Sequence, residues 1–402
     1  MSDAAGLRNH VIALSEKPRI LIARLSAIGD CVHSVPLVHA LRDRFPDAYI
    51  AWATQNAAAS LLSGLGGLDE VLVVRKDWLK SIGEIRRIRR ELLCRQFDVA
   101  LDIQSLTKSS AIAWLSGAKH RIGFAAPQGR ELSLLLNNVR QPPQANHVVD
   151  RYLELLQPLG IHKPRICFEM PHYTDARRQV DTWLQPWLQQ QPDDQRLFAV
   201  INPGAGWGSK VWPAERYASV ARHLHRRHGI RSVVVWAGSE EHQWARTIQH
   251  ASDDSAWLAP ETSLPELVEL LRQCRLFVGS DTGPLHMAAA VNIPCVALFG
   301  PTSPERCGPY GSQHQVVTSP GAVRRTSMRK VDVMEGISTE AVCQACDRLC
   351  ELFSQEQAAR KPSAVGRQIC YQYDMKSTRS AGIGRRWRFL PRMLLRFRST
   401  VK

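Results

Sequence analysis

The stretch RLSAIGDCVHSVPLV, residues 24–38, follows an apolar run and precedes a segment with helical spacing. A nucleotide-binding α/β fold has the glycine-rich turn after its first strand at such a place. The stretch offers one glycine, Gly29, which allows a sharp turn, and an acid, Asp30, directly after it. A carboxylate at the start of a helix is a good cap and is stabilised by the helix dipole. Asp30 is therefore either a cap alone or a cap that also faces a ligand.

Strand-like apolar runs alternate with helical segments on both sides of this turn. The first series has apolar runs at 19–25, 48–54, 71–74 and 97–103 and helical spacing over 30–44, 78–95, 107–116 and 148–159. The second series has apolar runs at 197–202, 232–238, 276–280 and 294–300, each followed by a helical stretch. Such alternation is typical of a parallel sheet covered by helices. We predict an α/β protein with two Rossmann-like domains that face each other across a cleft.

The length and composition agree with two domains. The chain has 402 residues, of which 44% are hydrophobic, and this is enough for two cores of ordinary size. Breakers and polar residues between the two series indicate a linker. The expected division is an N-terminal extension at 1–18, a first domain with Asp30 at 19–160, a linker region at 161–195, a second domain at 196–355 and a basic tail at 356–402.

The positive charge is concentrated at the C-terminal end. Residues 360–402 contain 12 Lys or Arg and one acid, Asp374, so only +4 of the net charge of +15 belongs to residues 1–359. A body near neutrality argues against nucleic acid as a partner. In residues 384–402 arginines are interleaved with Trp, Phe, Met and Leu, which indicates either an anchor at an anionic membrane surface or a disordered basic extension.

Two further features bear on the compartment. The sequence has no run of about 18 apolar residues that could span a membrane. Its N-terminal segment lacks the apolar centre of a secretory signal. We expect a cytoplasmic protein, peripheral on the inner face of the cytoplasmic membrane.

One strand end in the second series has the residues of an anion site. In VGSDTGPLHMAAA, residues 278–290, Asp281 and Thr282 follow a strand, and Gly283 and Pro284 open a helix. Free amides and the dipole at such a helix start can bind a diphosphate without a metal. An ordinary well-capped helix has the same pattern.

A second strand end supplies a flexible loop and a cation. The segment INPGAGWGSKVWPAERYASVARHL, residues 201–224, contains three glycines, among them Gly206, and then Lys210. Glycines would let the loop fold over a phosphate to which Lys210 brings a charge, whereas the alternative is a solvated surface lysine. Ligands of open α/β sheets bind beyond the carboxyl ends of the strands, so these loops and Asp30 should share the cleft. Because Asp30 would repel a diphosphate, we expect it to contact the other substrate as a general base.

Four segments together resemble one known family. They are LSAIGDCVHSVPLVHALR (25–42), INPGAGWGSKVWPAERYA (201–218), LFVGSDTGPLHMAAAVNIPCVALFGPTSPERCGPYG (276–311) and FDVALDIQSLTKSSAIAWLSGAKHRIGF (97–124). The first three look like signature blocks of the ADP-heptose:lipopolysaccharide heptosyltransferases, glycosyltransferase family nine, and the fourth is similar to a region of heptosyltransferase I.

This resemblance covers about residues 18–355 and carries expectations about fold and activity. It implies the two-domain glycosyltransferase B fold and an inverting, metal-independent transfer without a cofactor. The implied donor is a nucleotide sugar, ADP-heptose, bound by the second domain. The implied acceptor is a lipid-linked saccharide of the lipopolysaccharide core.

The resemblance also implies roles for individual residues. Asp30 matches the catalytic aspartate, and Lys210 matches the lysine at the donor phosphates, where it would stabilise the departing diphosphate. The implied donor-binding residues are Gly206, Lys210, Glu240, Glu241, Asp281, Thr282, Gly283 and His286, with the choice between the two glutamates open; the implied acceptor-binding residues are Lys108 and Arg121. Ser105 departs from the family pattern, which has a glycine there.

Two groups have a structural interpretation. Cys343, Cys346 and Cys350 lie at i, i+3 and i+7 of a predicted helix, which favours a packing stripe over an incomplete zinc site. His33, three residues after Asp30, is expected to be buried with its polar atoms satisfied.

The alternative to an enzyme is a non-catalytic scaffold that binds a sugar nucleotide or associates with a membrane. A degenerate relative should lose its catalytic acid and its phosphate-binding lysine first. Both Asp30 and Lys210 are present, which favours the enzyme.

Overall fold

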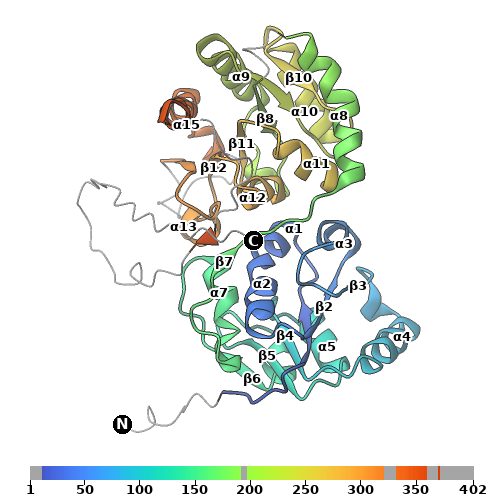
Figure 1. Ribbon diagram of the computed structural model, residues 1–402. Helices are drawn as coiled ribbons and strands as arrows, with labels where there is room; N and C mark the ends of the chain where they lie inside the picture. The colour runs from blue at the N-terminus through green and yellow to red at the C-terminus, as the bar shows by residue number, and fades with distance from the viewer. Residues whose placement is uncertain (1–10, 192–196, 321–331, 360–369, 372–402) are drawn as a thin grey trace, which may run out of the picture.

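The computed structural model describes residues 11–191, 197–320, 332–359 and 370–371 (Figure 1). Most strands of these residues form two six-stranded parallel sheets. The first sheet has the order β3-β2-β1-β4-β5-β6, with β1 (Arg19–Ala23), β2 (Tyr49–Thr54), β3 (Glu70–Val73), β4 (Val99–Asp102), β5 (His120–Phe124) and β6 (Val139–Gln141). The second repeats this order as β10-β9-β8-β11-β12-β13, with β8 (Phe198–Asn202), β9 (Arg231–Val234), β10 (Ala256–Leu258), β11 (Leu276–Ser280), β12 (Cys295–Phe299) and β13 (Gln315–Thr318). The predicted α/β class with two Rossmann-like sheets is confirmed.

Helices connect successive strands of each sheet. In the first domain they are α1 (Ile28–His33), α2 (Val35–Arg44), α3 (Asn56–Leu62), η1 (Trp78–Lys80), α4 (Ile82–Leu93), α5 (Thr107–Leu115), α6 (Ser133–Leu136), α7 (Val148–Glu154) and η2 (Gln157–Leu159). In the second they are η4 (Gly208–Lys210), α9 (Ala214–His228), α10 (Gly238–His250), α11 (Leu264–Leu271), α12 (Gly283–Ala290), α13 (Pro304–Cys307), α14 (Asp332–Glu335) and α15 (Thr339–Ala359).

The central strands are mostly apolar and are buried along their whole length, because helices cover both faces of each sheet. Every residue of β8, β11 and β12 is buried. Where these strands end, the buried apolar pattern gives way to loops that are free to carry polar groups. The carboxyl ends of both sheets lie toward the middle of the molecule, where α1 and α12 pack against each other (Figure 1).

The range 161–195, for which the sequence indicates a linker, contains the strand β7 (Ile166–Cys167) and the helix α8 (Thr174–Gln189). Helix α8 packs on α11 of the second domain. Strand β7 pairs antiparallel with β14 (Cys370–Tyr371), which comes from the far end of the chain. Apart from residues 356–359 and this strand, the basic tail lies outside the described residues. None of the helices in the described part of the chain is long and apolar enough to cross a membrane.

Helix α15 shows how the three clustered cysteines are used. Cys346 and Cys350 are buried in the core of the second domain together with Val342 and Leu349, and Cys343 is half-buried at its edge. Their spacing is thus that of a packing stripe.

Candidate active site

A cleft of about 480 Å³ lies between the two domains. It receives Asp30 from α1 and, from the second domain, Lys210, Thr282 and His286. The predicted residues on its walls are Asp30, Lys210, Asp281, Thr282, Gly283 and His286. The two loops that follow β8 and β11 and the turn that follows β1 are far apart in the sequence, yet they meet in this cleft. This agrees with the expectation that ligands of open α/β sheets bind beyond the carboxyl ends of the strands.

Asp30 is fixed by two neighbours from its own domain. Its Oδ2 is ion-paired with the guanidinium of Arg24, whose side chain is only 7% exposed. Its Oδ1 accepts a hydrogen bond of 3.0 Å from the hydroxyl of Tyr152 on α7. Burial raises the pKa of Tyr152, so this hydroxyl stays protonated and remains a donor. The Asp30 side chain nevertheless keeps 37% of its surface exposed, which leaves it accessible to a substrate hydroxyl.

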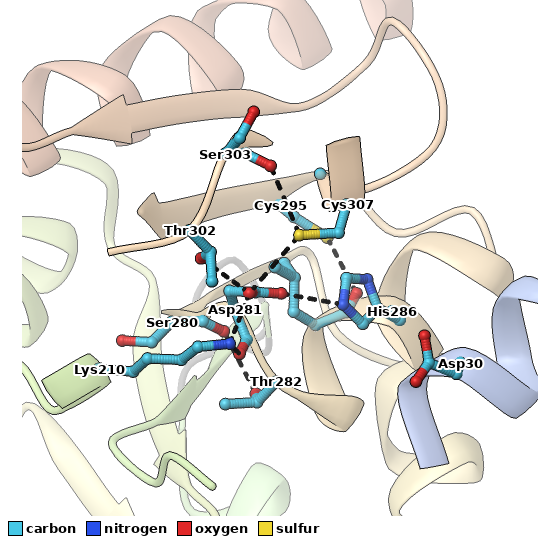
Figure 2. A network of polar contacts seen from close by, with 12 residues as sticks. Asp30, Lys210, Ser280, Asp281, Thr282, His286, Cys295, Thr302, Ser303 and Cys307 are labelled. Atoms are coloured by element: carbon cyan, nitrogen blue, oxygen red, sulfur yellow. Dashed lines mark hydrogen bonds and ion pairs between the residues drawn. The ribbon is translucent and has the colours of Figure 1, made fainter. Parts of the chain in front are cut away.

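On the opposite wall, the carboxylate of Asp281 is the centre of a polar network (Figure 2). Its Oδ2 accepts from Lys210 Nζ at 2.6 Å and from Thr302 Oγ1 at 2.8 Å. Its Oδ1 lies 3.1 Å from His286 Nε2. Burial alone would raise the pKa of this carboxyl, but the hydrogen bond and charge of His286 and the charge of Lys210 outweigh it and hold that pKa well below its usual range. Both oxygens of Asp281 are thus engaged by protein groups, and the residue positions Lys210 and His286.

The two walls touch where α1 meets α12. A Cβ added at Gly29 would lie 2.6 Å from His286 Cδ2, and one added at Gly283 would lie 3.3 Å from Ile28 Cγ2. The close contact between α1 and α12 therefore depends on two residues without side chains.

His33 packs beside this contact, with its ring centroid 4.1 Å from that of His286. It is buried as expected, but neither ring nitrogen has a hydrogen-bond partner, so the expectation of a satisfied histidine is wrong. Burial, followed by the nearby His286 and His147 rings, lowers the pKa of His33 well below its usual value, and the ring stays neutral.

The two residues expected to bind an acceptor lie elsewhere on the first domain. Lys108 is exposed and its Nζ donates to the carbonyl of Lys76 at 3.0 Å. The Arg121 guanidinium donates to the backbone carbonyls of Leu136 and Ala118. Neither is among the described residues that line the cleft.

Three of the expected donor-binding residues also lie off the cleft walls. Gly206 belongs to the loop that carries Trp207, which itself lines the cleft. Glu240 is exposed in the first turn of α10. Glu241 is half-buried, accepts a 2.8 Å hydrogen bond from the amide of Ala237 and packs against the backbone at Gly204.

Sequence reasoning missed several side chains of the site. They are Arg24, Tyr152, Gln128, Arg130, Thr302 and Arg306, all on the cleft walls. Arg24 lies near the end of the first predicted strand, and an arginine within such an apolar run is a signal of a functional site. Tyr152 lies inside a predicted helix and gives no such signal, because only the fold brings it to Asp30.

Two sheets of the same strand order, with a polar cleft at their carboxyl edges, are the architecture of the glycosyltransferase B fold. Among solved structures, Escherichia coli heptosyltransferase WaaC with ADP matches with a TM-score of 0.66 and 25% identity, covering 82% of this chain and 99% of that one. The chain belongs to glycosyltransferase family 9, the heptosyltransferases, whose pattern it matches over residues 85–337, more than half of its length. It is an enzyme of that family, and the sequence resemblance is confirmed.

Two relatives illustrate the level of similarity. The lipopolysaccharide core heptosyltransferase OpsX of Haemophilus influenzae is 26% identical, covering 76% of this chain and 85% of its own length. The lipopolysaccharide heptosyltransferase 2 of Escherichia coli is 29% identical, covering 85% of this chain and 100% of its own.

Proposed function

We propose that the protein transfers a heptose from ADP-heptose to a saccharide of the lipopolysaccharide core, with inversion at the transferred carbon. The relatives are named as lipopolysaccharide heptosyltransferases, and a similar solved structure carries ADP. The observation that carries the proposal is the arrangement of the cleft. An accessible carboxylate, Asp30, stands on one wall, and a cation, Lys210, is held beside a helix start on the other.

In this mechanism Asp30 takes the proton of the acceptor hydroxyl. The hydroxyl oxygen forms a bond to the anomeric carbon, and the bond from that carbon to the diphosphate breaks on the opposite face, which inverts the centre. The hydroxyl becomes strongly acidic as its new bond forms, and Asp30 takes its proton at that stage. Arg24 and Tyr152 fix the direction in which the carboxylate points.

The electron pair of the broken bond ends on the diphosphate of ADP, whose negative charge grows in the transition state. Lys210 and the start of α12 face this charge in our proposal. Gly283 is the first residue of α12 and provides the first amide of the helix, whereas Pro284 has no N–H to offer. Asp281, which is itself bonded to His286, keeps Lys210 in place, and Thr282 lies at the same helix start.

The remaining contacts are assigned by exposure. The Glu241 carboxylate accepts from the amide of Ala237, which leaves Glu240 as the freer partner for the donor ribose, and the loop with Gly206 borders the donor side. For an anionic acceptor, Arg130 on the cleft wall is better placed than Arg121, which is engaged by carbonyls. Lys108 is available at the surface of the same domain for a more distant acceptor phosphate.

The test combines a substrate panel with one variant. Purified protein is offered several nucleotide sugars, and nucleotide diphosphate release is measured with and without a lipid-linked core acceptor. We expect ADP release from ADP-heptose that depends on the acceptor, and a loss of about 100-fold or more in Asp30→Asn with donor affinity retained. Asp43→Asn, an exposed acid on the neighbouring helix α2, is the matched control and should keep full activity.

Two outcomes would contradict the proposal. Release of ADP from none of the donors, with donor binding intact, would indicate the non-catalytic scaffold. Collapse of donor affinity in Asp30→Asn with unchanged turnover of the bound donor would make Asp30 a structural cap.

We also propose that the basic tail, residues 356–402, concentrates the enzyme at the anionic inner face of the cytoplasmic membrane, beside a lipid-linked acceptor. Its sequence supports this, because residues 360–402 contain 12 cationic residues and a single acid. Each arginine near an anionic leaflet contributes on the order of 1 kcal/mol.

A further inference from the structure

A second cluster of ligand-type side chains lies outside the cleft, between α9 and α15. His223 and His228 come from α9, and Asp347 comes from α15. The Nε2 atoms of the two histidines lie 2.8 Å and 2.6 Å from the same oxygen, Asp347 Oδ1. All three ligand atoms lie within 4.8 Å of one another. The cluster is a separate site, because none of its members is among the described residues that line the cleft.

The packing of the two helices produces this convergence. Helix α15 contributes Cys346 and Leu349 to a buried cluster that also contains Val220 and Leu224 of α9. Asp347 is next to Cys346 in the sequence and so lies at the edge of this contact. His228 is the last residue of α9, where Gly229 ends the helix in the left-handed conformation with φ of 66°. The two histidines are five positions apart, which puts them about 140° apart on an ideal helix, yet both rings reach one carboxylate oxygen.

The chemistry of the cluster is that of a zinc site. Two imidazole nitrogens and a carboxylate oxygen are ligands that Zn²⁺ prefers, and a fourth position remains for water. The three side chains are 28%, 16% and 19% exposed, so an ion can reach them from solvent. We propose that His223, His228 and Asp347 bind one Zn²⁺ ion, which joins α15 to α9. In the structure each Nε2 faces an acceptor oxygen and so donates to it; when the ion binds, it takes the place of that proton, which moves to Nδ1 of the same ring.

One cation competes for the same oxygen. Arg227 Nε lies 3.3 Å from Asp347 Oδ1, but its side chain is 57% exposed. A second acid, Glu351, lies 4.0 Å from the other end of the same guanidinium. Arg227 can therefore turn toward Glu351 when an ion enters. Its removal should strengthen metal binding, because a positive charge is taken from beside the ion.

The experiment measures Zn²⁺ binding to the full chain after removal of metal with a chelator. All proteins carry Cys94→Ser, because Cys94 is an exposed thiol that could bind zinc by itself. Isothermal titration gives the number of equivalents and the affinity for this reference protein and for His228→Gln, Asp347→Asn and Arg227→Gln. His250→Gln, an exposed histidine at the end of α10, is the matched control.

We expect one zinc equivalent in the reference protein and the control, and its loss in His228→Gln and Asp347→Asn. Arg227→Gln should bind about threefold to tenfold more tightly, a gain that misfolding does not produce. Zinc should raise the thermal unfolding temperature of the reference protein and not that of His228→Gln. Circular dichroism without metal checks that the variants are folded.

Equal zinc binding by the reference protein and both ligand variants would overturn the proposal, as would the absence of binding in the reference protein. Unchanged or weaker binding by Arg227→Gln would also count against it. These readouts do not involve glycosyl transfer, so their outcome is separate from that of the proposed function.

Discussion

Replacement of Gly29 by alanine tests whether the contact between α1 and α12 is needed for activity. The new Cβ would lie 2.6 Å from His286 Cδ2 and 3.6 Å from Gly283 Cα. Carbon atoms in contact prefer about 3.5–4.0 Å, so the first distance is short by about 1 Å. His286 has little freedom to move, because it is 6% exposed and its Nε2 is bonded to Asp281. The strain must therefore move α1, with Asp30, away from the second domain.

The size of the effect follows from the cost of this overlap. Overpacking of this kind costs about 1–3 kcal/mol. The preference for alanine over glycine in a helix, about 0.8–1.0 kcal/mol, does not offset this cost, because α1 is helical whether or not the walls touch. A penalty of about 1–3 kcal/mol on the arrangement in which the walls touch corresponds to a fall of about 5- to 150-fold in kcat/KM.

The assay is the initial rate of acceptor-dependent ADP release, with Gly83→Ala as the control. Gly83 is likewise the second residue of a helix, α4, but a Cβ there meets only Ser81 Oγ at 3.7 Å. We expect Gly83→Ala to keep the wild-type rate and both variants to unfold within a few degrees of the wild type. A Gly29→Ala enzyme within twofold of the wild type would refute the reasoning, as would an equal loss in the control.

Three further predictions concern the second wall, the first core and the tail. Lys210→Ala should lower kcat by about 100- to 1,000-fold, because charge on the diphosphate grows in the transition state. Replacement of the exposed Lys80 by alanine is the control, and an unchanged rate of Lys210→Ala at saturating donor would exclude this role. Ser105→Ala should lower the free energy of unfolding by about 1–3 kcal/mol, because Ser105 Oγ accepts from the buried amide of Phe124 at 2.9 Å. Chemical denaturation checks this, with replacement of the exposed Ser60 by alanine as the control; equal midpoints of the two variants would contradict the prediction. A chain ending after residue 371 should lose salt-sensitive co-sedimentation with anionic vesicles; retention of binding would remove the tail from membrane association, and this end point keeps the pairing of β14 with β7.

Much of the fold was predictable because buried parallel strands read as continuous apolar runs. β8 and β11 are examples, and the polar residues that follow them, Lys210 and Asp281, were correctly expected in the cleft. Helix α8 was assigned to a linker because prolines and polar residues before it mask its helical spacing.

The partners of the site residues were harder to predict because they depend on distant parts of the chain. Tyr152 reaches Asp30 across 122 residues, and a pattern search within short windows does not connect them. Asp281 lies on the cleft wall, and the motif does not predict that Lys210, Thr302 and His286 bond its oxygens. Whether an acid meets a ligand or its neighbours depends on three-dimensional packing, which the motif alone does not contain.

The pairing of β14 with β7 has a mechanical consequence. The chain leaves the first domain after β7, builds the second domain through α15 and then returns to lie beside β7. The two domains are thus joined by two passages of the chain that meet in a small antiparallel ribbon. A single strand allows a domain to swivel about any axis, whereas a paired ribbon bends easily across its flat face and resists bending along its edge. At this point of the chain, bending across the flat face of the ribbon is therefore easier than bending along its edge.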